Sequence, residues 1–141
     1  MPLIDTSTEF GQRVQRRLEK ETVIWLTTQD EDGTPQPSPV WFLLENDDEI
    51  ILYSQPNKPK VRNIEQRPVV ALNFNATESG GNVVIFHGEG WIGNDAPACS
   101  DVPNYIKKYA TGIAGLGMTP KEFAEEYSVP IRIKLTKLRG F

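Results

Sequence analysis

Short runs of β-branched and aromatic residues, separated by turn-forming residues, dominate the first half of the chain. The runs at 22–28, 40–44 and 50–54 are rich in Val, Ile, Leu, Trp, Phe and Tyr, which favour strands. Asp30–Gly33 and the acidic stretch 45–49 lie between the runs, and both are typical of tight turns. This spacing predicts a meander of three strands.

The rest of the chain predicts further strands with peripheral helices. Strands are expected at 69–75 and 83–91, and residues 131–136 alternate between apolar and polar side chains as a half-buried strand does. About six strands in 141 residues predict one domain, 1–141, built as a closed or partly closed barrel.

Capping signals mark where the helices begin. A helix is expected at 7–20, opened by a capping box of Thr6 and Glu9. A short helix is expected from Val61 and another at 101–110. A second capping box, Thr119 to Glu122, opens a further helix, and the glycines at 112–117 favour a flexible connector before it.

Composition excludes several classes of protein. Fifteen Lys and Arg residues against nineteen Asp and Glu give a net charge of −4, which disfavours a nucleic-acid binder. No apolar run approaches the ~20 residues that span a bilayer. The single cysteine, Cys99, cannot form an internal disulfide, and no metal-ligand spacing is present. We expect a cytoplasmic protein without a metal, a nucleic-acid partner or a membrane partner.

The stretch from Tyr53 to Ile64 is the most informative for chemistry. A strand ends in hydroxyl side chains, a turn follows, and a short helix begins with Lys58, Lys60 and Arg62. A helix N-terminus offers free N–H groups and the positive end of the dipole, both suited to phosphate. A solvated basic helix is the alternative, although three cations at that end of a helix call for a compensating anion.

Three alternating prolines precede Trp41. Pro35, Pro37 and Pro39 remove backbone donors, which confines the start of this strand to a sheet edge or to a bent position. A free edge could pair with a planar heterocycle beside Trp41, or the prolines could only protect the edge from aggregation.

No self-sufficient catalytic set is present. His87 and Cys99 each lack a partner group nearby in the sequence, and both are interpreted as structural. We therefore assign no catalytic residue and expect a bound cofactor to supply any difficult chemistry.

Taken in order, these motifs resemble the pyridoxamine 5′-phosphate oxidase-like split β-barrel family, and within it the small deazaflavin-dependent reductases. The resemblance rests on the 22–28 strand, on Pro-Ser-Pro-Val-Trp-Phe at 37–42, on Lys-Pro-Lys-x-x-Asn-Ile at 58–64 and on Val-Val-Ile-Phe-His-Gly-Glu-Gly at 83–90. It covers nearly the whole chain.

The resemblance implies a mainly β (α+β) fold: a six-stranded split β-barrel with peripheral helices, forming a homodimer with cofactors at the interface. The positions that match the family's cofactor-binding sites fall into two groups. Those near the phosphate are Lys58, Lys60, Ser54 and Asn63, and those along the ring are Ser38, Pro39, Val40, Trp41 and Tyr53. Gly90 and Trp91 would face the partner's cofactor.

The resemblance also implies hydride transfer between a deazaflavin (coenzyme F-420) and a small unsaturated substrate, with a proton from solvent. Arg62, Lys107 and Lys108 would extend a basic surface toward the carboxylates of the deazaflavin tail. FMN is the alternative cofactor, for an oxidase or reductase. A further alternative is a non-catalytic protein that binds flavin, haem or a tetrapyrrole. The ending Lys137–Phe141 lacks the family's arginine-rich, proline-terminated segment, so vitamin B6 oxidation is not expected.

Overall fold

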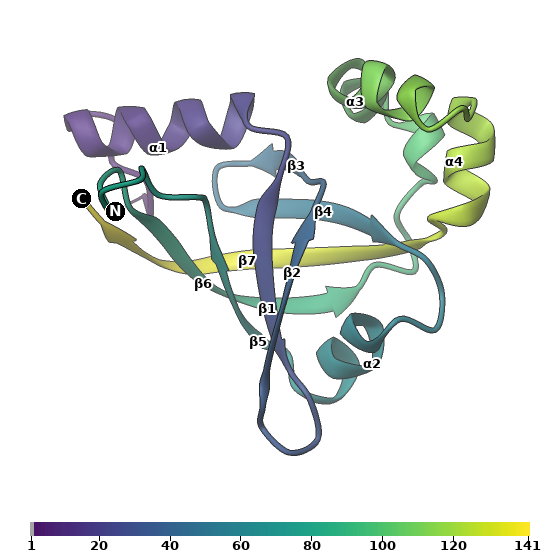
Figure 1. Ribbon diagram of the computed structural model, residues 1–141, viewed down its shortest axis with the longest axis horizontal. Helices are drawn as coiled ribbons and strands as arrows, with labels where there is room; N and C mark the ends of the chain where they lie inside the picture. Colours follow the sequence, from purple (N-terminus) through teal and green to yellow (C-terminus); the bar gives the residue numbers. More distant parts are fainter. Residues whose placement is uncertain (1) are drawn as a thin grey trace.

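The computed structural model describes residues 2–141 and contains one strongly curled antiparallel sheet with helices around it (Figure 1). The sheet has seven strands in the order β2-β1-β5-β6-β7-β4-β3. The strands are β1 (Ile24–Gln29), β2 (Pro35–Val40), β3 (Leu43–Asn46), β4 (Glu49–Ser54), β5 (Val69–Asn73), β6 (Val84–Ile92) and β7 (Val129–Gly140). The helices are α1 (Glu9–Lys20), α2 (Pro59–Gln66), the 3₁₀ turn η1 (Cys99–Asp101), α3 (Pro103–Gly115) and α4 (Pro120–Glu126).

The sheet closes into a split barrel because β2 and β3 are consecutive in the chain but lie at opposite ends of the strand order. β2 pairs with β1, and β3 pairs with β4. Only Trp41 and Phe42 separate the two strands. The prediction of six strands is thus one short, since the expected single strand at 40–44 divides at these two residues. The edge position of the proline-rich β2 is confirmed, and its pairing extends back to Pro35.

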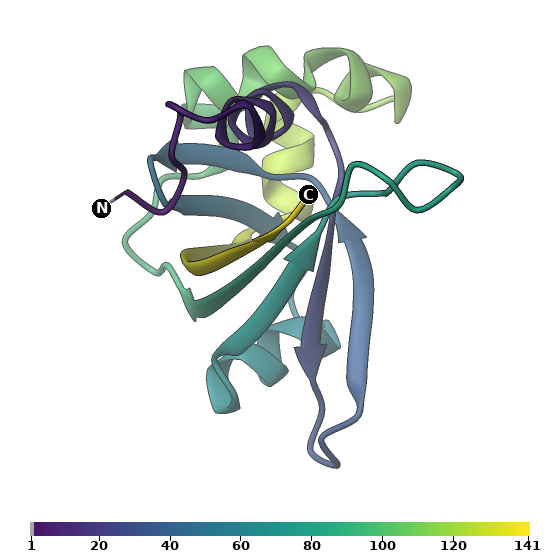
Figure 2. The same ribbon diagram turned by 90° about the vertical axis from the view of Figure 1, so that its left-hand side faces the viewer.

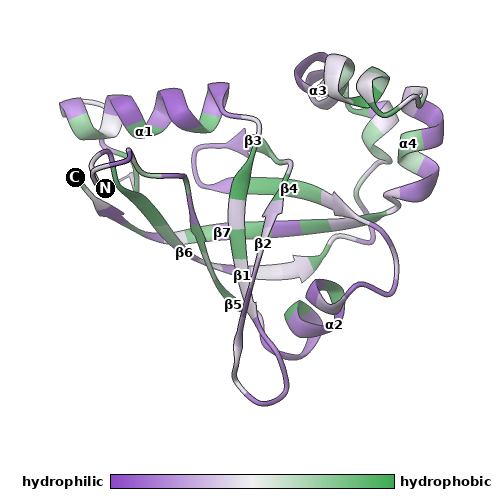
Figure 3. Cartoon of the chain, viewed as in Figure 1, coloured by the Kyte–Doolittle hydropathy of each residue, from purple (hydrophilic) through white to green (hydrophobic). Residues whose placement is uncertain are grey.

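Two helices cover the ends of the barrel (Figures 1 and 2). Val14 and Leu18 of α1 join the barrel core, and the polar side of α1 faces away from the sheet (Figure 3). At the other end, Ile64 of α2 packs against Gly90 and Ile133. Each helix is therefore held by the apolar side chains it buries.

A second apolar core lies outside the barrel, between α3, α4, η1 and the outer face of β4. Its fully or nearly fully buried members are Ile51, Tyr53, Cys99, Tyr105, Tyr109, Ile113 and Phe123. Because β4 is buried on both faces, the Ile50–Tyr53 run does not alternate between apolar and polar side chains.

The helix boundaries differ from expectation in two places. Thr8 caps α1, accepting a hydrogen bond from the Gly11 amide, so the box predicted at Thr6 does not form. Residues 112–115 continue α3 instead of forming a connector. The capping box of Thr119 and Glu122 is confirmed, as is the inward alternation of 131, 133 and 135. No helix among residues 2–141 is long and apolar enough to cross a membrane.

Candidate functional site

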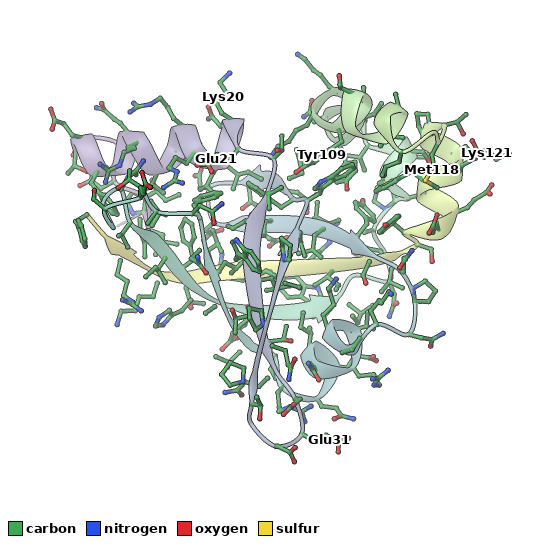
Figure 4. All side chains as sticks on the ribbon, viewed as in Figure 1. Lys20, Glu21, Glu31, Tyr109, Met118 and Lys121 are labelled. Carbon is green, nitrogen blue, oxygen red and sulfur yellow. The ribbon has the colours of Figure 1, made fainter. Side chains whose placement is uncertain are left out.

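A cavity of about 260 Å³ is lined by residues of both ends of the curled sheet and of three helices, and we call it the seam pocket. The lining comes from β2 and the bend after it, from β4, from α2, and from α3 and α4 with the residues that follow them. Its lining residues are Pro39, Val40, Trp41, Tyr53, Lys60, Tyr105, Leu116, Phe123 and Tyr127. Figure 4 shows the side chains gathered between α3, α4 and the sheet, near the labelled Tyr109.

Stacked rings form the apolar side of the seam pocket. The Trp41 indole lies between Tyr109, at 4.5 Å between ring centroids, and Phe123, at 5.3 Å. Phe123 in turn stacks on Tyr127 at 4.3 Å. The interplanar angles of these three contacts are 8°, 19° and 15°, so four rings form one nearly parallel column. Such a column makes this side of the pocket apolar, and it covers both faces of the Trp41 indole.

Burial raises the pKa values of Tyr53 and Tyr105 in the seam pocket and of the nearby Cys99. Burial raises the pKa of Tyr53 to about 12, and its hydroxyl group donates to the Pro97 carbonyl at 2.9 Å. Burial also raises the pKa of Tyr105. The nearby Cys99 is fully buried, and burial raises the pKa of its thiol to about 11. These groups are therefore poor proton donors and poor nucleophiles at pH 7.

Among the described residues that line the seam pocket, Lys60 is the only one with a charged side chain. Burial, and then the charge of Lys58, lowers the pKa of Lys60. Among residues 2–141, neither lysine lies within 4.0 Å of a carboxylate. The first turn of α2 has no side-chain cap, and Lys58 is its N-cap residue. Two cations thus meet an uncapped helix N-terminus, an arrangement that favours an anion.

Five of the nine sequence-predicted cofactor residues line this one cavity: Pro39, Val40, Trp41, Tyr53 and Lys60. The other four do not line it, and Asn63 lines a different cavity. Lys58 is exposed at the start of α2, and Ser38 is half-buried in β2. The Ser54 hydroxyl group donates to the Gln55 carbonyl. Asn63 is buried and donates from its amide to the Thr28 hydroxyl group at 3.0 Å, which ties α2 to β1.

The remaining basic residues do not form one continuous surface with Lys60. Arg62 lines a separate cavity of about 380 Å³, opposite Asp30, Glu31 and Asp32. Lys108 turns inward and donates to the Phe42 carbonyl at 2.9 Å. The prediction that Lys108 extends a basic surface with Arg62 and Lys107 is therefore wrong.

Gly90 and Trp91 point in opposite directions from β6. Gly90 faces Ile64 inside the barrel, where an added Cβ would lie 3.2 Å from an Ile64 methyl group. Trp91 lies on the outer face of the sheet and is 41% exposed. His87 lies on the same face and is half-buried. Of these three residues, only Trp91 and His87 lie on a side where a partner subunit could reach them.

Sequence patterns did not assign the helical side of the seam pocket, which consists of Tyr105, Leu116, Phe123 and Tyr127. A signal was present: Tyr105 and Tyr109 are four residues apart, and so are Phe123 and Tyr127. That spacing places each pair on one helix face. It does not say what that face covers.

The curled sheet, the end-capping helices and the pocket beside β2 define a split-barrel protein. The sequence profile of the pyridoxamine 5′-phosphate oxidase family matches residues 10–137, so the chain belongs to that family. A search of curated proteins found no match.

Solved structures of the same fold support this assignment. An F-420 reductase superposes with a TM-score of 0.68 and 23% identity, over 89% of this chain and 94% of that one. The conserved hypothetical protein Rv2991 of Mycobacterium tuberculosis superposes with a TM-score of 0.72 and 18% identity, over 94% of this chain and 82% of that one. An FAD-binding protein of Mesorhizobium loti superposes with a TM-score of 0.64 and 16% identity, over 90% of this chain and 88% of that one. At these identities the likenesses establish the fold.

Proposed function

We propose that this protein is an oxidoreductase that binds a phosphate-bearing deazaflavin, coenzyme F-420, in the seam pocket and transfers hydride between it and a small planar unsaturated substrate. The observation that carries the proposal is the convergence of Pro39, Val40, Trp41, Tyr53 and Lys60 on one cavity. These residues come from β2, the bend after it, β4 and α2, and they combine apolar side chains with one half-buried cation.

The phosphate end of the cofactor is assigned to Lys58, Lys60 and the first turn of α2. Because burial and mutual repulsion lower the pKa of Lys60, an anion between the two lysines would stabilise both charges. Charge-assisted hydrogen bonds of this kind contribute about 1.5–3 kcal/mol each. A structural role would instead call for a carboxylate, and the described residues offer none within reach.

The ring end of the cofactor is assigned to the free edge of β2. Its prolines occupy alternate positions, so the pairing with β1 depends on the N–H groups of the other residues. The carbonyl groups of Pro37 and Pro39 are left on the free edge, which therefore offers acceptors and no donors. A flavin or deazaflavin ring carries an imide N–H that suits such an edge, and the Trp41 indole makes the adjoining part of the pocket apolar.

The size of the seam pocket supports the proposal that a second copy of the chain completes the site. At about 260 Å³, the cavity is below the range of roughly 300–1,000 Å³ that holds a whole drug-sized ligand. We propose that a second copy covers the rest of the cofactor by packing on the outer face of the sheet, where Val69 and Trp91 are 59% and 41% exposed.

When bound, the cofactor supplies the hydride, and the chain's own residues hold and shield it. The apolar column from Trp41 to Tyr127 excludes water from one side of the pocket. The pocket tyrosines with raised pKa values do not release protons near pH 7, so the proton that accompanies the hydride comes from solvent.

FMN is the second candidate, because Lys58 and Lys60, which we call the lysine clamp, would bind its phosphate equally well. The choice of deazaflavin rests on the sequence resemblance to deazaflavin-dependent reductases and on the F-420 reductase among the proteins of similar fold.

Turnover tests the proposal. Reduced F-420 should be oxidised by the protein in the presence of planar quinones or enones, at a rate that falls in Lys60→Ala. Binding of either cofactor without turnover of any acceptor would favour a non-catalytic cofactor carrier. Tighter binding of FMN than of F-420, at both low and moderate salt, would contradict the deazaflavin assignment.

A further inference from the structure

The peptide of Phe42 lies where the sheet ladder stops. β2 ends at Val40 and β3 begins at Leu43, so neither Trp41 nor Phe42 has a strand partner. The Phe42 side chain is fully buried. Its amide and carbonyl groups must therefore find partners inside the protein, because a buried unpaired backbone group is costly.

Two adjacent residues of α3 supply those partners. The Phe42 amide donates to the Tyr109 hydroxyl group at 2.7 Å, and the Lys108 ammonium group donates to the Phe42 carbonyl at 2.9 Å. The Tyr109 hydroxyl group also lies 2.9 Å from the carbonyl oxygens of Phe42 and Thr22. A hydroxyl group has one hydrogen to donate. Since Lys108 already serves the Phe42 carbonyl, the hydrogen of Tyr109 is free for Thr22.

The same two residues hold the side chains at the break. The Tyr109 ring stacks on the Trp41 indole with 8° between their planes. The Lys108 ammonium group lies 3.8 Å from the centroid of the Phe42 ring. Backbone and rings at the break are thus fixed from one helix.

We infer that Tyr109, assisted by Lys108, is a positioning residue of the seam pocket, which orients the Trp41 indole through the Phe42 peptide and the ring stack. Neither Tyr109 nor Lys108 lines the pocket, so both act through Trp41, which does. The claim that the orientation of Trp41 governs cofactor affinity rests on the proposed function. The claim that Tyr109 and Lys108 orient Trp41 is independent of it.

Tyr109→Phe separates the hydrogen bonds from the ring stack. In a Trp25→Phe/Trp91→Phe background, Trp41 is the single tryptophan, and its quenching by acrylamide reports its exposure. We expect Tyr109→Phe to increase this quenching. In the wild-type background it should weaken binding of F-420 or FMN roughly tenfold, the equivalent of one net hydrogen bond. Tyr109→Leu, which also removes the stack, should have a larger effect.

Two controls distinguish positioning from general destabilisation. Thr28→Val removes a buried hydrogen bond between β1 and α2, away from Trp41, and should lower stability without changing Trp41 quenching. Lys108→Met should increase the quenching, and Lys107→Met, which changes the exposed neighbour, should not. If Tyr109→Phe does not fold, the two lysine variants decide.

Unchanged Trp41 quenching in both Tyr109→Phe and Lys108→Met would overturn the inference, whatever the cofactor results. Increased quenching with unchanged affinity for a cofactor that the wild type binds would overturn the link to the pocket. If the wild type binds neither cofactor, the proposed function fails, and quenching alone then decides whether Tyr109 orients Trp41.

Discussion

Gly112 of α3 lies directly against the edge of the Trp41 indole, where a Cβ atom would come within 2.9 Å of the ring carbon Cη2. The absence of a side chain at 112 lets the indole lie flat between Tyr109 and Phe123. Helix propensity alone would favour alanine here.

Gly112→Ala should therefore displace Trp41 and weaken cofactor binding, although alanine usually stabilises a helix by about 0.5–1 kcal/mol over glycine. Gly115 in the same helix is the matched control, since an added Cβ there meets nothing within 4 Å. Urea unfolding should show Gly115→Ala to be neutral or stabilising and Gly112→Ala to be less stable than it. Equal stability of the two variants, with wild-type Trp41 emission, would contradict the packing described.

The lysine clamp makes a second prediction. Lys58→Ala and Lys60→Ala should each weaken cofactor binding about tenfold or more, because each loses a charge-assisted hydrogen bond to phosphate. Arg62→Ala is the control, since Arg62 lines the other cavity and its guanidinium donates to the Asn57 carbonyl. Calorimetry that finds unchanged affinity in both lysine variants would exclude the clamp.

Lys108 should make the free energy of unfolding rise with pH in mildly alkaline solution. Burial lowers the pKa of Lys108 from 10.5 to about 8. Between these values the Lys108 side chain binds more protons in the unfolded chain than in the folded one, so its contribution to stability increases with pH. Lys60, whose pKa is also lowered, acts in the same direction, whereas Cys99 and Tyr53, whose pKa values are raised, act in the opposite direction. From about pH 7 to about pH 9.5, the free energy of unfolding of the wild type and of Lys107→Met should therefore increase relative to that of Lys108→Met. The same pH dependence in Lys108→Met as in the wild type would show that Lys108 is not responsible.

Asn63 makes a prediction about stability. Its amide group donates to the Thr28 hydroxyl group, and both residues are at least 95% buried. Asn63→Ala should lower the free energy of unfolding by about 1–3 kcal/mol, since it leaves the Thr28 hydroxyl group unpaired. A double-mutant cycle with Thr28→Val measures the coupling. Additive effects would mean that the hydrogen bond contributes nothing.

How far the sequence predicts this fold depends on the range of the interactions. The edge position of β2 follows from its alternating prolines, and the start of α4 follows from Thr119 and Glu122, because both signals are local. The break at Trp41–Phe42 could not be predicted. Its backbone groups are satisfied by Tyr109, which is 67 residues away from Phe42 in the chain.

The same distinction holds for the site. Tyr53 and Lys60 belong to one short motif, and the family resemblance grouped them with residues of the β2 strand. Tyr105, Phe123 and Tyr127 reach the seam pocket only because α3 and α4 pack on the outer face of β4. Their helical spacing predicts a shared face but not the surface it covers.

The most direct test of the account is an equilibrium titration of the purified protein with coenzyme F-420 and, separately, with FMN, followed by cofactor absorbance and fluorescence. The account predicts saturable binding of one cofactor per chain, tighter for F-420, and weakened about tenfold or more by Lys60→Ala but not by Arg62→Ala. Absence of saturable binding of either cofactor to the wild-type protein would contradict the assignment of the seam pocket.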